Sequence, residues 1–287
     1  MALRNPNLGP SHMHARKRRL FLIRFYIILF FVFVIVFGLA IFSGNEKVKI
    51  QTIIVSGNAA VSSDAVLAIA NRDMAGRYWY LFSRANSLIF PRFQIRKDLL
   101  KEIKTISDVS ISWDNWQEIS IVITERRPHS VWCGPTLPNG SDGASSDSKC
   151  FFVDKYGYIY SEAPSFSGSI FIRDYGLSAQ AGNISTSTSA VGQYFLSRQT
   201  YSKIFNLVDS LDKNNIKVVA VSFDGTDFRL ILESGPAIVF TNEDNFDSAF
   251  QNLFTAVENK SLDLVDGAGN ISYIDLRFDN KIVIGKK

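Results

Sequence analysis

The residues best suited to chemistry in this chain are one histidine and two cysteines, His129, Cys133 and Cys150. A histidine four positions before a cysteine supplies the residue types of an activated thiol nucleophile. However, His129 is the only histidine after residue 14, so any histidine-based catalyst or metal site would depend on a single side chain. Two cysteines and one histidine also leave zinc without a suitably spaced fourth ligand. We therefore expect no metal site and no catalytic residue, with a cysteine–histidine enzyme as the alternative.

Other common enzyme signatures are missing from the sequence. It has no glycine-rich phosphate loop, no paired-histidine zinc helix and no Gly-x-Ser-x-Gly nucleophile turn. The chain is therefore predicted to be a binding protein that uses no cofactor and no small-molecule substrate. A cell-wall hydrolase built on two converging carboxylates is a further alternative.

Cys133 and Cys150 enclose residues 134–149, a segment rich in glycine, serine and aspartate. The flanking pairs Val131-Trp132 and Phe151-Phe152 are typical of strands. In an exported domain the natural interpretation is a disulfide at the base of this insertion, worth about 3 kcal/mol in the chain-entropy model. Two buried thiols are the alternative.

A strongly apolar segment, residues 20–42, follows the basic cluster Arg16-Lys17-Arg18-Arg19. Residues 25–42 carry no charge, and at about 1.5 Å per residue they cover roughly 27 Å, close to the ~30 Å of a bilayer's hydrocarbon core. Because basic residues beside a first helix stay in the cytoplasm, we expect one transmembrane helix with the N-terminus inside. The alternative is a cleaved signal peptide ending near Gly38-Leu39-Ala40.

The same cluster explains the charge of the chain. Six positive charges and no acid lie in the first 24 residues, so the net charge of +4 leaves −2 for the rest. The basic balance therefore indicates membrane topology, and no nucleic-acid partner is expected.

After a polar linker at residues 43–47, the β-branched residues 48–56 predict a strand that ends at Gly57-Asn58. Ser62 or Ser63 is expected to cap a helix that breaks within residues 71–76, and residues 95–106 have helical spacing. Strands are expected at 109–113 and 119–124, with a turn between them. The aromatic run Tyr78-Trp79-Tyr80 is expected to pack into the loop core; a membrane-facing or partner-facing patch is the alternative.

Beyond residue 128 the pattern is mostly strands with two helices. Strands are expected at residues 130–132, 151–154, 158–160, 169–173, 216–223, 228–232, 237–240, 271–278 and 281–285, and helices at 197–212 and 245–259. The fold class is therefore α+β, with a mixed, mainly antiparallel β domain. The Ser/Thr-rich residues 180–191 are expected to form an exposed loop.

Several of these segments together resemble the FtsQ/DivIB family of bacterial cell-division proteins. Ile53-x-Val55-x-Gly57-Asn58 and Ile119-x-Ile121-x-Ile123-x-Glu125-Arg126-Arg127-Pro128 are similar to the two ends of that family's POTRA domain. Cys150-Phe151-Phe152-Val153-Asp154-x-x-Gly157-x-Ile159-Tyr160 resembles the first strands of its β domain, and Tyr273-Ile274-Asp275-Leu276-Arg277-Phe278 resembles its penultimate strand. The chain departs from the family pattern at Trp116-Gln117, where Trp-Pro is usual, and at the 134–149 insertion.

The resemblance implies a cytoplasmic tail (1–19), a transmembrane helix (20–42), a POTRA-like β-α-α-β-β domain (48–128) and an FtsQ-type β domain (129–287). It further implies a non-catalytic, single-pass scaffold of the inner membrane at the division septum. Such a scaffold binds FtsB/FtsL-type partners through its C-terminal strands and other division proteins through the POTRA-like domain, and links early and late division proteins to septal peptidoglycan synthesis. A POTRA module that serves export or envelope assembly is the alternative.

The candidate partner-binding site lies in the last two expected strands. The first would place Ile274, Leu276 and Phe278 on one face, and the second would be the final strand, whose unpaired N–H and C=O groups suit strand addition. The resemblance points to Phe278, Asn280 and Gly285, and the final strand itself contributes Ile282, Val283 and Ile284. Lys286 replaces a Trp common in the family. The alternative is an edge protected by Lys281, Lys286 and Lys287.

Overall fold

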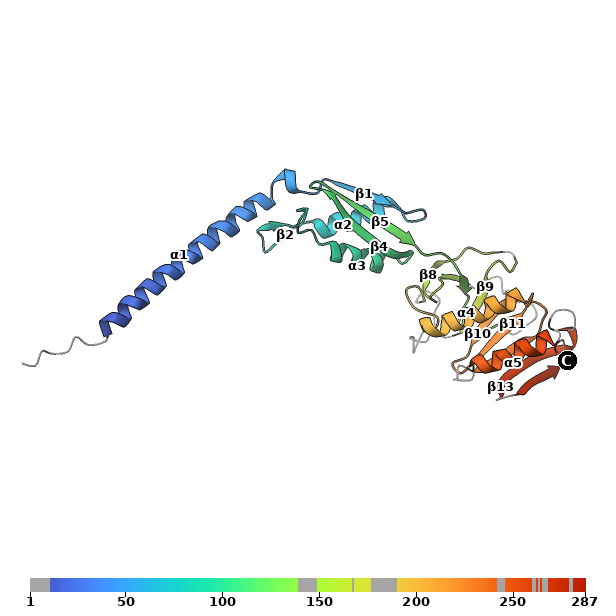
Figure 1. The fold of residues 1–287 in the computed structure, drawn as a ribbon. Coiled ribbons are helices and arrows are strands. Elements are labelled where there is room, and N and C mark those ends of the chain that lie inside the picture. The colour runs from blue at the N-terminus through green and yellow to red at the C-terminus, as the bar shows by residue number, and fades with distance from the viewer. Residues whose placement is uncertain are drawn as a thin grey trace, which may run out of the picture. The chain divides into compact units, whose positions relative to one another are not determined.

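The structure is a computed structural model that describes residues 11–138, 149–166, 168–176, 190–241, 246–259, 262, 264, 268–278 and 281–287. It divides into two compact units (Figure 1). The N-terminal unit comprises Met1–Glu102 and Asp108–Thr124, and the C-terminal unit comprises Ile103–Ser107 and Glu125–Lys287.

The N-terminal unit begins with the long helix α1 (Ser11–Ser43). The expected apolar segment 20–42 lies inside it. The helix starts earlier than that segment because residues 11–19 contain no helix breaker and several good helix formers. Lys17–Ser43 is long and apolar enough to cross a membrane, and it is the one such helix in the part of the chain that the structure describes. A signal sequence near the N-terminus has the same properties.

The rest of this unit has two helices beside a small sheet. Its elements are β1 (Thr52–Ser56), α2 (Ser63–Met74), β2 (Arg77–Tyr78), β3 (Phe82–Ser83), α3 (Arg92–Glu102), β4 (Ile106–Asn115) and β5 (Glu118–Glu125). The sheet order is β1-β5-β4, with β1 parallel to β5, and β2 and β3 pair separately. α2 packs against α3 and against β1, and their shared core includes Val66, Ile95, Leu99, Ile119 and Ile121.

Several boundaries in this unit differ from expectation. Ser62 caps α2 as predicted, accepting a hydrogen bond from the Asp64 N–H. The first strand starts only at Thr52, because Glu46–Val48 forms a 3-10 turn capped by Asn45. α3 ends at Glu102 instead of Ile106, which opens β4. An isoleucine at that spacing suits a buried helix face or a buried strand equally well.

One prediction in this unit is wrong. Tyr78-Trp79-Tyr80 was expected to pack into the loop core, yet Trp79 is 85% exposed and Tyr80 is 93% exposed. Both residues lie at the tip of the β2–β3 hairpin, and their side chains are exposed there.

In the described residues, the C-terminal unit contains a mixed nine-stranded sheet and two α-helices (Figure 1). The strands are β6 (Ser130–Trp132), β7 (Phe151–Val153), β8 (Ile159–Glu162), β9 (Ile172–Gly176), β10 (Val218–Phe223), β11 (Asp227–Leu232), β12 (Ala237–Thr241), β13 (Ile271–Phe278) and β14 (Lys281–Lys286). Their order is β14-β13-β12-β11-β10-β9-β6-β7-β8. Pairing is parallel at β13/β12, β10/β9 and β9/β6 and antiparallel elsewhere. The expected α+β class with a mixed, mainly antiparallel sheet is confirmed.

The two helices, α4 (Arg198–Lys213) and α5 (Phe246–Glu258), supply the main core of this unit. α4 begins one residue later than predicted, because Ser197 is its N-cap and its hydroxyl accepts a hydrogen bond from the Thr200 N–H. Its apolar stripe, which includes Tyr201, Ile204 and Leu211, is buried in one cluster with residues of the sheet and of α5. The loop expected at 180–191 lies mostly outside the described residues. Its last position but one, Ala190, is fully buried instead of exposed.

The opposite face of this sheet carries a smaller apolar cluster. Val131, Cys133, Tyr175 and Ala220 form it, with Leu137 and Cys150 packed against them. Side chains alternate between the two faces of a strand, which is why Trp132 belongs to the helix side and its two neighbours do not. Beyond this cluster, toward β11, β12 and β13, this face is left open by the described residues and is hollowed.

Candidate functional site: the C-terminal sheet edge and its adjoining hollow

β14 is the last strand of the nine-stranded sheet, and β13 is its one neighbour among the described residues. The two strands run antiparallel, with Ile284 opposite Ile274, Val283 opposite Asp275 and Gly285 opposite Tyr273. Val283 and Ile284 are both exposed, while Ile282 is partly buried against the main core. The edge therefore offers apolar side chains on both faces of a strand whose outer side is unpaired within the described chain.

Phe278 is the last residue of β13, and it is more exposed than Ile274 and Leu276, with which it was predicted to share a face. Ile274 and Leu276 are buried, whereas Phe278 is 54% exposed. The register also shifts between Asp275 and Phe278, so the pairing of β13 with β14 is irregular there. Phe278 is therefore available for contact at the end of the strand, where Ile274 and Leu276 are not. Asn280 lies outside the described residues.

Gly285 has a local reason to be glycine. A Cβ atom placed on it would lie 2.2 Å from Cε1 of Tyr273, so the ring of Tyr273 covers the Gly285 backbone. A cross-strand aromatic–glycine pair of this kind stabilises a sheet edge that lacks a side chain. Gly285 thus leaves room for the Tyr273 ring over the strand, at the border of the open face.

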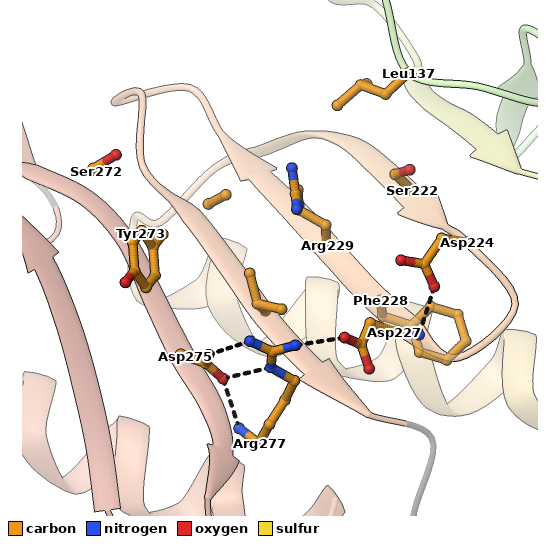
Figure 2. Close-up of a pocket in the computed structure, with 12 residues that line it drawn as sticks. Leu137, Ser222, Asp224, Asp227, Phe228, Arg229, Ser272, Tyr273, Asp275 and Arg277 are labelled. Carbon is orange, nitrogen blue, oxygen red and sulfur yellow. Dashed lines mark hydrogen bonds and ion pairs between the residues drawn. The ribbon is translucent and has the colours of Figure 1, made fainter.

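Beside this edge the open face is hollowed, with a volume of about 510 Å³ (Figure 2). Its floor is formed by residues of β11, β12 and β13, among them Arg229, Val239 and Tyr273. Leu137, from the segment that follows Cys133, borders it on the far side from Tyr273 (Figure 2). The lining is mixed in charge, so the hollow is a shallow polar groove and not an apolar ligand pocket.

A charged bridge crosses the floor of the hollow. Arg277 donates from Nε and Nη2 to the two carboxylate oxygens of Asp275, at 2.9 and 2.6 Å, and from Nη1 to Asp227 at 2.7 Å (Figure 2). Asp227 belongs to β11 and Arg277 to β13, so the bridge spans the intervening β12. The Arg277 guanidinium lowers the pKa of Asp275 below its ordinary value, and the two aspartates raise the pKa of Arg277. Asp275 and Arg277 are therefore both charged at neutral pH.

Asp224 closes the β10–β11 turn at one end of the hollow. Its carboxylate accepts hydrogen bonds from the N–H groups of Thr226 and Asp227, at 3.0 and 2.8 Å. Those backbone donors lower the pKa of Asp224. This carboxylate is thereby committed to the turn, which argues against its use as a general acid.

The structure does not bring His129 together with Cys133 and Cys150, the three residues from which a catalytic or metal site could have been built. Cys133 and Cys150 are joined in a disulfide on the open-face side of the sheet. The ring of His129 instead packs against Phe205 of α4, with ring centroids 4.7 Å apart. Burial lowers the pKa of His129, partly opposed by the charges of Asp209 and Asp154. Within the described residues, no group of three or more His, Cys, Asp or Glu side chains is placed to hold a metal ion.

A buried polar cluster was not found from the sequence. Asp174 on β9 is completely buried, and the Ser130 hydroxyl donates to its Oδ2. The Ser130 hydroxyl also lies 2.9 Å from the hydroxyl of Tyr201. Burial raises the pKa of Asp174 well above its ordinary value, because the charged carboxylate would lose its hydration. In the sequence Asp174 follows Arg173, just beyond the strand expected at 169–173, and nothing there indicates that it is buried.

No protein-family model matches the chain, and no curated protein is significantly similar to it. The function of the edge is therefore inferred from its residues and geometry. An unpaired strand with exposed apolar side chains on both faces can accept a partner strand through backbone hydrogen bonds. The adjoining hollow can receive side chains of such a partner.

Proposed function

We propose that this protein is a non-catalytic, single-pass membrane scaffold of the bacterial division complex, similar in role to FtsQ/DivIB proteins. In this proposal α1 anchors the chain in the inner membrane, the β1-α2-α3-β4-β5 arrangement corresponds to a POTRA-like domain, and β14 receives an FtsB-type partner. The POTRA-like domain would contact other division proteins, and the protein would concentrate at the septum. The observation that carries the proposal is the open β14 edge with Phe278, Val283 and Ile284 exposed beside it.

The membrane part of the proposal rests on the apolar Lys17–Ser43 helix and on the basic residues at its N-terminal end. With Arg16 to Arg19 on the cytoplasmic side, the chain beyond Ser43 would lie outside the cytoplasm. Cysteine labelling in intact cells tests this, in a background with both native cysteines replaced by Ala. A cysteine replacing Ser11 should resist an impermeant thiol reagent, and one replacing Lys155 should react. The opposite pattern would refute the orientation, and release of the ectodomain from the membrane would indicate signal cleavage.

Strand addition at β14 is supported by the position and the side chains of that strand. Its N–H and C=O groups on the outer side have no partner strand in the described chain, and a partner there would extend the sheet without rearranging it. Lys281 and Lys286 are exposed at its two ends. These lysines discourage association of two copies of this edge by like-charge repulsion, while leaving the apolar centre of the strand open to another partner.

The test compares full-length variants in a host that carries the proposed FtsB-type partner. Ile284→Glu places a charge at the edge, and Ile170→Glu places the same charge at an exposed isoleucine elsewhere in the C-terminal unit. Phe278→Ala removes an exposed ring, and Phe93→Ala removes one from the N-terminal unit. We expect the two edge variants to lose co-purification of the partner by at least tenfold while their controls retain it. Wild-type co-purification of both edge variants, at normal abundance, would refute binding at β14.

The non-catalytic part of the proposal has a separate test. His129 packs against Phe205 and lies away from the disulfide, so His129→Gln should support growth of a depletion strain. Loss of growth with normal abundance and folding would favour the enzyme alternative.

A further inference from the structure

The tip of the β2–β3 hairpin exposes a group of large apolar and aromatic side chains. Trp79 and Tyr80 are almost completely exposed, and Leu81, Leu88 and Ile89 are exposed beside them in sequence. Isolated exposed apolar residues are common, but five within eleven positions indicate a contact surface. We call this group, Trp79, Tyr80, Leu81, Leu88 and Ile89, the hairpin patch.

The backbone at this tip is strained in a way that presents the rings outward. Trp79 has φ 47° and Tyr80 has φ 62°, and the Leu81 N–H closes the turn on the Tyr78 carbonyl at 3.0 Å. Turns with two consecutive positive φ values strongly favour Asn and Gly, because a Cβ atom is unfavourable there. Two bulky aromatic residues in these positions cost stability, and strain of this kind is concentrated at functional sites.

The hairpin is fixed to the end of α1. The Ser83 N–H donates to the Ser43 hydroxyl at 3.0 Å, and the Asn86 side-chain amide donates to the Ser43 carbonyl at 3.3 Å. All three residues are buried, and β3 packs directly against α1. Ser43 is the last residue of α1 and follows directly on the uncharged run that ends at Phe42. The hairpin is therefore held at the level where the apolar helix ends.

The composition of this segment suits a bilayer interface. Residues 76–91 contain no Asp or Glu, and their charged residues are Arg77 and Arg84. The Arg84 guanidinium lies 5.3 Å from the centroid of the Tyr78 ring. Trp and Tyr concentrate at both membrane–water interfaces, where their rings are apolar and their N–H and O–H groups reach water, and Arg binds lipid phosphates.

We propose that the hairpin patch inserts into the headgroup layer of the membrane that α1 crosses, as a second membrane contact of the N-terminal unit. This inference rests on the proposed membrane anchoring by α1. The headgroup region is about 5–8 Å deep on each side of the hydrocarbon core, a depth that side chains beside the helix end can reach. With two membrane contacts, α1 and the hairpin patch, the part of the N-terminal unit that follows α1 would have a restricted orientation relative to the membrane.

The test uses full-length protein in liposomes of phosphatidylethanolamine and phosphatidylglycerol, with and without bromine on the lipid chains. Bromine quenches tryptophan fluorescence at short range, so the quenched fraction reports rings that contact lipid. The chain has four tryptophans, and Trp79→Phe is compared with Trp116→Phe, which removes an exposed ring at the β4–β5 turn of the same unit. We expect bromine-dependent quenching of the wild type to fall at least threefold in Trp79→Phe and to persist in Trp116→Phe.

Flotation of the liposomes separates the two levels of the proposal. Protein that fails to float with the lipid overturns the membrane anchoring and with it this inference. Protein that floats, but whose quenching is the same in Trp79→Phe and in the wild type, overturns the hairpin inference alone and leaves the anchoring in place. That result would show that the Trp79 ring does not contact lipid. A protein partner, which the liposomes do not contain, would then be the occupant to test.

Discussion

Replacing Arg277 with Gln removes the cation that crosses the floor of the hollow. The side chain of Asp275 is only 6% exposed, and its carboxylate accepts two hydrogen bonds from the Arg277 side chain and one from the Arg277 backbone N–H. In the variant this carboxylate is left buried without an opposite charge. Arg229→Gln is the matched control, because Arg229 lines the same hollow and acts on Asp224 only as a nearby charge.

The expected magnitude follows from burial. Removing one partner of a fully buried ion pair costs about 3–5 kcal/mol. The Arg277 side chain is 40% exposed, so water already screens part of the interaction, and we expect a loss of about 2 kcal/mol. For a unit of this size that corresponds to a fall of about 4–8 °C in the unfolding temperature. Adding Asp275→Asn to the variant should recover part of the loss, since no buried charge then remains unpaired.

The assay is denaturant unfolding followed by Trp132 fluorescence, since Trp132 is buried in the C-terminal unit. The other three tryptophans are replaced by Phe in all proteins compared. Arg277 lowers the pKa of Asp275, so its stabilisation is present above the ordinary aspartate pKa of about 3.9 and is lost as pH falls through the lower folded-state value. The stability difference between wild type and Arg277→Gln should therefore shrink below about pH 4. Equal stability of the Arg277 and Arg229 variants at pH 7 would refute this reasoning.

The elements with strong local signals could be predicted from the sequence. β6 and β13 occupy the expected residues, and α4 starts directly after its cap Ser197, because β-branched runs and capping residues act over a few positions. Boundaries were less accurate where an apolar residue suits two structures. Ile106 has helical spacing to Leu99 and Ile103, yet it is buried as the first residue of a strand.

Two of the motif residues that carried the family resemblance prove to have structural roles. Gly57 has φ 78°, and a Cβ there would lie 2.2 Å from the carbonyl oxygen of Ile123, so only glycine fits. Arg126 is almost buried, forms an ion pair with Asp154 and lies 4.1 Å from the centroid of the Tyr158 ring. Gly57 is informative about the fold, because the close backbone approach at this position leaves no room for a side chain.

The candidate site could be predicted only in part. The final strand and its exposed residues follow from local alternation, but the bridge joins Asp227 to Arg277 across 50 positions, and pairings at that separation leave no local pattern. Trp79 and Tyr80 were misjudged for a different reason. Aromatic residues usually bury in water-soluble folds, and the sequence of a loop does not indicate whether it faces protein, water or lipid.

Three further predictions concern the C-terminal unit. Peptide mapping without reductant should recover Cys133 and Cys150 in one linked fragment. Replacing both with Ala should lower the free energy of unfolding by about 3 kcal/mol, as expected for a loop of this length. Free thiols in alkylated protein would contradict the disulfide. Burial raises the pKa of Asp174, so the folded protein keeps a proton that the unfolded chain releases. The free energy of unfolding should therefore fall as pH rises from about 4 toward the folded-state pKa, by at most about 1.4 kcal/mol per pH unit. Asp174→Asn should remove this contribution, and an unchanged pH dependence of unfolding would show that Asp174 does not cause it. Gly285→Ala should force the Tyr273 ring away from the edge, since the new Cβ would lie 2.2 Å from Cε1. The Tyr273 ring is exposed and can move outward, so the loss of stability should stay near the lower end of the about 1–3 kcal/mol typical of overpacking. Partner co-purification should fall at least tenfold, because the displaced ring obstructs the edge. Gly269→Ala is the control, because a Cβ at Gly269 meets no atom within 4 Å. If the two alanine variants bind the partner equally well, the Tyr273–Gly285 pair does not shape the binding edge.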